Sequence, residues 1–371
     1  MTLSFHAPDR RLLIQTLVAA GGLVAFHAPA RAWSGSSPSN RANSETHRAD
    51  WQWLVGNWDV RHRRLQERLA GSDDWAEFAG KSACWPTMGG LGTIDDNILD
   101  LPGGTYRGAG VRAFDPTTGK WSIWWIDGRN PTRIDPPVVG GFVDDEGVFI
   151  GTDRFNDKQI DVRFRWHETR GGSPHWDQAF STDGGKSWEI NWRNYFTRTG
   201  VDPTPLPLLD DRGLSPRIRD WDFLAGRWNV RHRRLKDRLS GSKEWIDFDG
   251  TFVNWPILGG QGNVGDNVMN FPRGTIRGMG FRTFDPASEQ WSSWWIDNRN
   301  PAIVDTPVRG GFSTDGTGTF LADDSFEGRP IQVRVIWSRI TAKTARWEQA
   351  FSPDGGQSWE TNWISDFARM G

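Results

Sequence analysis

Residues 56–65 read GNWDVRHRRL, and residues 226–235 read GRWNVRHRRL. The agreement extends outward, because the whole stretch 50–198 aligns with the stretch 220–369. The offset is 170 residues until a single insertion near Gly316 and 171 residues beyond it, and eleven tryptophans fall in register. Each copy spans about 150 residues, which is enough for a self-sufficient domain. The chain is therefore a tandem duplication.

Within each copy the residue patterns are those of β-strands. Residues 160–166 (IDVRFRW) alternate apolar and polar side chains with the two-residue period of a half-buried strand, and residues 331–337 (IQVRVIW) keep that rhythm. Residues 121–127 (WSIWWID) are dominated by aromatic and β-branched side chains. Turn sequences such as DPTTG at 115–119 and DGG at 183–185 separate the strands. About eight to ten antiparallel strands per copy are expected, forming a barrel or a sandwich.

The composition shifts divide the chain into five segments. Domains are predicted at 50–199 and 220–371, joined by a Pro-rich linker at 200–219. Ahead of them lie a Ser/Asn-rich linker at 33–49 and an export signal at 1–32. Whether the two domains pack on each other is left open by the sequence.

The export signal rests on three features near the N-terminus. Arg10 and Arg11 precede an uncharged apolar run at 12–26, and Ala30-Arg31-Ala32 is a small-x-small cleavage pattern. The paired arginines resemble a twin-arginine signal, so a periplasmic or secreted protein is expected. The alternative is an uncleaved membrane anchor. The run is short and rich in small residues, which favours no stable membrane span after cleavage.

Charge and composition exclude several classes of function. The net charge is -2, with 44 Lys and Arg against 46 Asp and Glu, so no nucleic-acid partner is expected. The hydrophobic fraction of 36% understates the core, because 24 Trp and 21 Phe each bury a large area. Cys84 is the single cysteine, which excludes an internal disulfide and a Cys-rich zinc site. Its counterpart is Asn254, so a mechanism shared by both copies cannot use a thiol.

The start of each copy resembles the lipocalin and calycin barrels. Gly56-Asn57-Trp58 and Gly226-Arg227-Trp228 match the Gly-x-Trp signature of that superfamily. The resemblance implies that each Trp closes the floor of a barrel and that an Arg from the last strand packs across it. Arg198 and Arg369 lie where that Arg is expected. The expected fold is therefore all-β, with two tandem lipocalin-like antiparallel β-barrels.

The remainder of each copy is similar to a family of exported bacterial lipocalin-like proteins of mostly unassigned function. The phrases that carry this likeness are FLAGRW at 223–228, LGGQGN at 258–263, FDP at 284–286 and WEQAF at 347–351. The resemblance covers both copies almost end to end. It implies the fold and says little about activity.

A second resemblance concerns one hairpin in each copy. Residues 181–188 (STDGGKSW) and 352–359 (SPDGGQSW) resemble the Asp box of sialidase-type propellers. There the box stabilises a turn and has no catalytic role, so we interpret these segments as structural turns.

A barrel of this size can hold one small ligand in its interior. Candidate site residues are polar or aromatic side chains that both copies share and that the strand period directs inward. The candidate ligand-binding residues are Trp125, Arg129, Asn130, Arg163, Gln178 and Asn191 in the first copy and Trp295, Arg299, Asn300, Arg334, Gln349 and Asn362 in the second. The same criterion also selects Asp96, Asn97 and Arg112 with their counterparts Asp266, Asn267 and Arg282.

Four residues are candidates for proton transfer. His62 and His232, the histidines common to both copies, could each act as a general base whose pKa is lowered by the neighbouring arginines. Alternatively, they lie on a solvated basic strand face. Asp127 and Asp297, each two residues before an Arg, could help to fix a carboxylate or sugar hydroxyls, or could form an internal salt bridge that holds a loop. No His or Cys at ligand spacing accompanies the histidines, so neither a metal nor a cofactor is expected.

Three hypotheses about function follow. The first is an exported binding protein that holds a partly aromatic or hydrophobic small molecule in Trp- and Arg-lined barrels. The second is a cofactor-free periplasmic lyase, isomerase or hydrolase, in which Asp and His transfer protons and Arg stabilises negative charge. In the third, one copy is only a scaffold for the other. Whether the protein is an enzyme stays open at this point.

Overall fold

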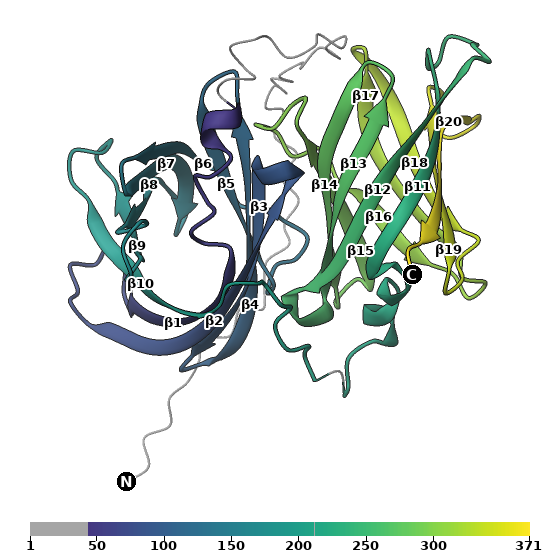
Figure 1. Cartoon of the computed structure of the whole chain (residues 1–371). Coiled ribbons are helices and arrows are strands. Elements are labelled where there is room, and N and C mark those ends of the chain that lie inside the picture. Colours follow the sequence, from purple (N-terminus) through teal and green to yellow (C-terminus); the bar gives the residue numbers. More distant parts are fainter. Residues whose placement is uncertain (1–43, 211) are drawn as a thin grey trace.

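The computed structural model describes residues 44–210 and 212–371. Within these residues the chain forms two closed antiparallel barrels of ten strands each (Figure 1). The predicted all-β fold of two tandem barrels is thereby confirmed. The predicted export signal and residues 33–43 of the first linker lie outside the described residues. No helix in the described part of the chain is both long and apolar enough to cross a membrane.

Barrel 1 is a meander in which each strand pairs with its neighbours in sequence, and β1 pairs with β10 to close the sheet. Its strands are β1 (Gly56–Leu65), β2 (Trp75–Thr87), β3 (Gly92–Leu101), β4 (Gly104–Asp115), β5 (Lys120–Asp127), β6 (Val138–Val143), β7 (Glu146–Phe155), β8 (Lys158–His167), β9 (His175–Ser181) and β10 (Glu189–Gly200).

Barrel 2 repeats this topology, with β11 pairing β20. Its strands are β11 (Gly226–Leu235), β12 (Trp245–Ile257), β13 (Gly262–Phe271), β14 (Gly274–Asp285), β15 (Gln290–Asp297), β16 (Val308–Phe312), β17 (Gly318–Phe326), β18 (Arg329–Ser338), β19 (Thr344–Ser352) and β20 (Glu360–Arg369). Short 3-10 helices are η1 (Met88–Gly90), η2 (Pro216–Arg219), η3 (Asp222–Leu224) and η4 (Leu258–Gly260).

The floor of barrel 1 is closed by a tryptophan and an arginine from paired strands. Trp58 on β1 lies opposite Arg198 on β10, and the Arg198 guanidinium stacks 4.0 Å from the centroid of the indole ring. The same guanidinium donates hydrogen bonds to the carbonyls of Trp53 and Val55, and the indole N–H of Trp58 donates to the carbonyl of Leu54. Arg198 thus fixes the turn before β1 to the end of β10.

Barrel 2 contains the same arrangement. Arg369 stacks 4.1 Å from the ring of Trp228 and donates to the carbonyls of Phe223 and Ala225. The predicted packing of Arg198 and Arg369 across the two Gly-x-Trp tryptophans is therefore confirmed, whereas the geometry by itself does not establish membership of a family.

The two segments that resemble Asp boxes form tight turns between neighbouring strands. Asp183 accepts hydrogen bonds from the backbone N–H groups of Lys186 and Ser187 and from the Ser187 hydroxyl. The indole of Trp188 donates to the carbonyl of Gly185. These bonds lower the pKa of Asp183 to about 2, so its carboxylate is stabilised as a hydrogen-bond acceptor of the turn.

One apolar cluster contains side chains of both barrels. It joins the outer faces of β2–β5 to those of β12–β15, and it includes Leu206 from the segment between the barrels. At its centre the rings of Trp85 and Trp255 lie 5.6 Å apart. Figure 1 shows these two groups of strands facing each other.

Two carboxylates make matching contacts between the barrels. Asp96 on β3 accepts a hydrogen bond of 2.8 Å from the backbone N–H of Leu258, and Asp266 on β13 accepts one of 2.8 Å from the N–H of Met88. Burial raises the pKa of Asp96 to about 7, against the opposing effect of Arg107 and the Leu258 hydrogen bond. Burial likewise raises the pKa of Asp266 to about 6.

Arg369→Met should lower the free energy of unfolding of barrel 2 by about 1–2 kcal/mol, because charge-assisted hydrogen bonds and a cation–π contact are lost at a partly exposed site. Arg227→Met is the matched control, since Arg227 is an exposed arginine at the same end of the barrel. Denaturant titration would measure both variants. Equal stability of the two variants would contradict the role given to Arg369.

Asp96 should make the protein less stable as the pH rises from 4 to 7. Its pKa is higher in the folded chain than in the unfolded chain, so the folded state binds the extra proton in this range and loses it near pH 7. Asp96→Asn should remove this pH dependence, which amounts in total to roughly 1.4 kcal/mol for each unit by which the pKa is raised. Denaturant titrations across this pH range test this, with exposed Asp73→Asn as control. An unchanged slope would contradict it.

Candidate ligand-binding cavities

Each barrel encloses a cavity between its strands. The volumes are about 300 Å³ in barrel 1 and about 370 Å³ in barrel 2. These volumes lie at the lower end of the range of roughly 300–1,000 Å³ for small-molecule sites. The cavities are called cavity 1 and cavity 2 below.

The apolar walls of both cavities are mainly aromatic. The walls form because side chains along each strand point alternately into and out of the barrel. On β8, for example, Ile160, Val162 and Trp166 are buried and line cavity 1. The aromatic residues are Tyr106, Trp124, Trp125, Phe155, Phe164, Trp166, Trp176, Phe180, Trp192 and Phe196 in cavity 1, and Trp221, Phe252, Trp294, Trp295, Phe320, Phe326, Trp337, Trp347, Phe351, Trp363 and Phe367 in cavity 2. Indoles therefore line these interiors without filling them.

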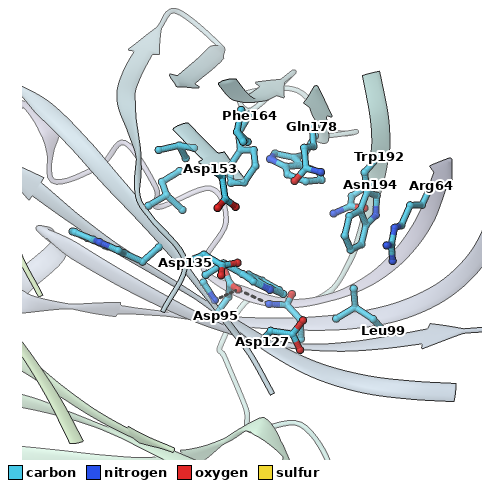
Figure 2. A pocket seen from close by; sticks show the side chains of 18 of the residues that line it. Arg64, Asp95, Leu99, Asp127, Asp135, Asp153, Phe164, Gln178, Trp192 and Asn194 are labelled. Atoms are coloured by element: carbon cyan, nitrogen blue, oxygen red, sulfur yellow. Dashed lines mark hydrogen bonds between the residues drawn. The ribbon is translucent and has the colours of Figure 1, made fainter. Parts of the chain in front are cut away.

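Many of the predicted site residues line the cavities. They are His62, Asn97, Arg112, Trp125, Asp127, Arg129 and Gln178 in cavity 1, and His232, Asn267, Arg282, Trp295, Arg299 and Gln349 in cavity 2. Figure 2 shows Gln178 and Asn194, from β9 and β10, facing Asp153 from β7 across this space. The structure thus brings together residues far apart in the sequence.

Other predicted site residues lie elsewhere. Asn130 and Asn300 are exposed in the turns that follow β5 and β15. Arg163 and Arg334 do not line the cavities, and their guanidiniums stack on the turn tryptophans Trp188 and Trp359 at 4.5 and 4.3 Å. Asn191 and Asn362 are fully buried and accept hydrogen bonds of 2.9 and 3.2 Å from the amides of Gln178 and Gln349. These two asparagines do not line the cavities but fix the amides of Gln178 and Gln349, which do.

Asp127 and Asp297 form internal salt bridges with the arginine two residues further on. The shortest carboxylate–guanidinium distance is 2.5 Å in both Asp127–Arg129 and Asp297–Arg299. Burial alone would raise the pKa of Asp297, but the bonds from Arg299 and Trp295 outweigh it and lower that pKa. Asp297 is therefore an anion that holds Arg299 at the cavity wall.

His62 and His232 are buried rather than solvated. Each ring stacks on a phenylalanine at 4.7 Å, Phe78 for His62 and Phe248 for His232. Nδ1 of His62 lies 2.6 Å from Oδ1 of Asn194. Burial, and not cationic neighbours as the sequence suggested, is the main cause that lowers the pKa of both histidines to about 4.

A glycine makes room for each histidine on the neighbouring strand. A Cβ atom at Gly80 would lie 2.5 Å from Nε2 of His62, and one at Gly250 would lie 2.9 Å from Nε2 of His232. Each imidazole is thus held between a phenylalanine ring and the backbone of the neighbouring strand at the glycine.

Sequence reasoning missed two arginines in each cavity. Arg64 and Arg68 line cavity 1, Arg234 and Arg238 line cavity 2, and none of the four forms an ion pair within the described chain. Burial, followed by repulsion from a neighbouring guanidinium, lowers the pKa of Arg68 to about 10 and that of Arg238 to about 9. Arg64 lies on the same strand face as Trp58, so the two-residue period could have found it.

An aspartate pair in each cavity was also missed. Asp135 and Asp153 line cavity 1, and Asp305 and Asp324 line cavity 2. Burial, with repulsion from Asp297 and Asp324, raises the pKa of Asp305 to about 7. Asp135 and Asp305 follow strands β5 and β15 in irregular loops, where no period marks a residue as inward.

The described residues provide neither a reactive thiol nor a cluster suited to a metal ion. Burial raises the pKa of Cys84 to about 12, which leaves its thiol unreactive. Within residues 44–210 and 212–371, no group of three or more His, Cys, Asp or Glu side chains is arranged to hold a metal ion. The cavities instead present fixed arginine and amide donors beside aromatic faces.

Both buried histidines should remain neutral until the pH falls to about 4. Proton NMR titration of the full chain, with His62→Gln and His232→Gln to assign the signals, would measure this. A midpoint near the ordinary value of about 6.5 would contradict the burial described above.

Neither a protein-family model nor a curated protein sequence matches this chain. Three solved structures are similar to it in part. An M. tuberculosis protein shows 12% identity over 44% of this chain and 98% of its own, with a TM-score of 0.30. A phycobiliprotein lyase from Guillardia theta shows 9% identity over 41% and 90%, with a TM-score of 0.29. A Nostoc punctiforme protein of unknown function shows 13% identity over 87% and 99%, with a TM-score of 0.26. Likenesses at this level carry no inference about ligand or activity.

Proposed function

We propose that this chain is an exported small-molecule-binding protein in which each barrel holds a partly aromatic or hydrophobic ligand. The observation that carries the proposal is a cavity in each barrel that combines indole faces with arginine and amide donors. Such a mixture of a large apolar surface and a few placed polar groups is typical of ligand sites.

The polar groups are positioned before any ligand arrives, which supports binding. Asn191 fixes the amide of Gln178, and Asn362 fixes that of Gln349. Asp297 fixes Arg299 through two of its guanidinium nitrogens. Preorganised donors reduce the entropy lost on binding.

The proposal places the protein in the periplasm or outside the cell. Arg10 and Arg11, the apolar run at 12–26 and the small-x-small pattern at 30–32 support this location. The proposal also treats the two barrels as one body, supported by the shared apolar cluster and by the hydrogen bonds of Asp96 and Asp266.

The second candidate function is a cofactor-free enzyme, which the carboxyl pair in cavity 2 favours. Asp305 has its pKa raised to about 7, so it can give or take a proton near neutral pH beside Asp324. Mass spectrometry of the compound released from purified protein separates the two functions. An enzyme should release product from the unmodified chain and substrate from Asp305→Asn, whereas a binding protein should release the same compound from both.

Gly280→Leu should block cavity 2, because Gly280 lines it and a Cβ there meets only ordinary contacts. N-phenyl-1-naphthylamine, a neutral aromatic probe, should bind the unmodified chain at two sites and the variant at one. Fluorescence titration would measure the stoichiometry. Gly103→Leu is the control, since nothing lies near its Cβ and its counterpart is already Arg273. Two sites in Gly280→Leu, or none in the unmodified chain, would refute binding inside the barrels.

A further inference from the structure

The two cavities differ around one buried arginine, which lies on β4 beside β3 in barrel 1 and on β14 beside β13 in barrel 2. The arginine is kept, as Arg112 and Arg282, but its surroundings change. Five neighbouring positions differ between barrel 1 and barrel 2: Ser82 and Phe252, Cys84 and Asn254, Thr93 and Asn263, Ile123 and Ser293, and Asp95 and Gly265. The last of these removes a carboxylate from barrel 2.

In barrel 1 the protein neutralises its own buried arginine. Nη1 of Arg112 lies 2.5 Å from Oδ2 of Asp95, and both side chains are almost fully buried. The other oxygen of Asp95 accepts hydrogen bonds from the backbone N–H of Gly110 and from the amide of Asn97. Figure 2 shows Asp95 at the edge of cavity 1. This charge pair is complete without a ligand.

In barrel 2 the same guanidinium has no carboxylate partner within the described chain. Arg282 is 7% exposed, stacks 4.2 Å from the ring of Trp221 and lines cavity 2. Its hydrogen bond runs from Nη1 to Oδ1 of Asn263, and its Nε has no acceptor in the described chain, which is equally true of Nε of Arg112 in barrel 1. Burial lowers the pKa of Arg282 to about 9, so the group still carries its charge at neutral pH.

The neighbouring amide of Asn263 adds a further donor, and its oxygen is already occupied. Oδ1 of Asn263 also accepts a hydrogen bond of 3.0 Å from Asn254, so both of its interactions fix the same orientation of the amide. Nδ2 of Asn263 is then a second buried donor without an acceptor in the described chain. In barrel 1 the counterpart of Asn263 is Thr93, and Nη1 of Arg112 donates to Asp95 instead.

The protein itself cannot supply the missing anion from strand β13. A Cβ atom at Gly265 would lie 2.2 Å from the ring of Phe252, so no larger side chain fits at this position while Phe252 stays in place. The described lining of cavity 2 contains four arginines and two aspartates, against five and four in cavity 1. Asp297, which lies outside that lining, pairs with Arg299, so the two cavities differ mainly at Arg282, which has no carboxylate partner in the described chain. A buried cation is stable only when paired.

We propose that cavity 2 binds the carboxylate of a small aromatic acid with Arg282 at the acid group, whereas in cavity 1 the equivalent Arg112 is already paired with Asp95. This inference rests on the proposed function and names the ligand class of one barrel. A planar guanidinium matches a carboxylate in shape and charge, and the aromatic wall of cavity 2 accommodates the rest of the molecule.

Naphthalene-1-acetate and naphthalene-1-acetamide, which differ mainly in charge, test the inference by calorimetry on the full chain. The sites lost in Gly280→Leu identify cavity 2. There the acid should bind about 10- to 100-fold more tightly than the amide, as expected for a charge-assisted hydrogen bond. The double variant Phe252→Ser with Gly265→Asp copies barrel 1 and should abolish this preference. Equal binding of acid and amide in cavity 2, or a preference unchanged in the double variant, would overturn the proposal.

One further variant and one further ligand distinguish failure of the anion site from failure of the proposed function. Arg282→Gln removes the charge through a single substitution, and it should abolish the preference for the acid if the double variant does not fold. Formate is small and needs only the anion site. Suppose that formate raises the melting temperature of the unmodified chain but not that of Arg282→Gln, and that neither naphthalene compound binds. The anion site is then supported and the proposed function is contradicted. If the compounds bind without a preference and formate has no effect, the proposed function stands and the anion site fails.

Discussion

Closure of each sheet by its first and last strands is the constraint on which the rest of this molecule depends. β1 pairs with β10 and β11 with β20, and in each barrel an arginine on the last strand stacks on the tryptophan of the first. Closure leaves no unpaired sheet edge and gives every strand an inside and an outside. The cavities, their aromatic walls and the contacts between barrels all follow from that division.

The sequence predicts the fold well because the strand pattern is local. Alternation in residues 160–166 needs no knowledge of distant contacts, whereas the Trp58–Arg198 pair was implied by the resemblance of the Gly-x-Trp phrases to lipocalin barrels. The site is predicted less well. Ile160 and Val162 face inward, and Arg163 faces outward because neighbouring residues on a strand point to opposite faces. Asn191 lies at a register shift between β10 and β9, where a bulge changes which side chains face the cavity.

Comparison of the two copies carries information that neither copy holds alone. Positions that agree, such as His62 and His232 beside Gly80 and Gly250, mark what the barrel needs to stay packed. Positions that disagree around a retained residue mark a change of chemistry. Arg282 keeps the place of Arg112 after its carboxylate has gone, so the charge that balances it has to come from elsewhere.

The matching hydrogen bonds of Asp96 and Asp266 have a consequence for the segment between the barrels. Each barrel supplies the acceptor for a loop of the other, so these two bonds do not require a continuous backbone between them. The linker instead makes their formation intramolecular, at an effective concentration on the order of millimolar. A cut in the backbone near residue 211 would break neither bond, but it would make the association of the halves depend on dilution.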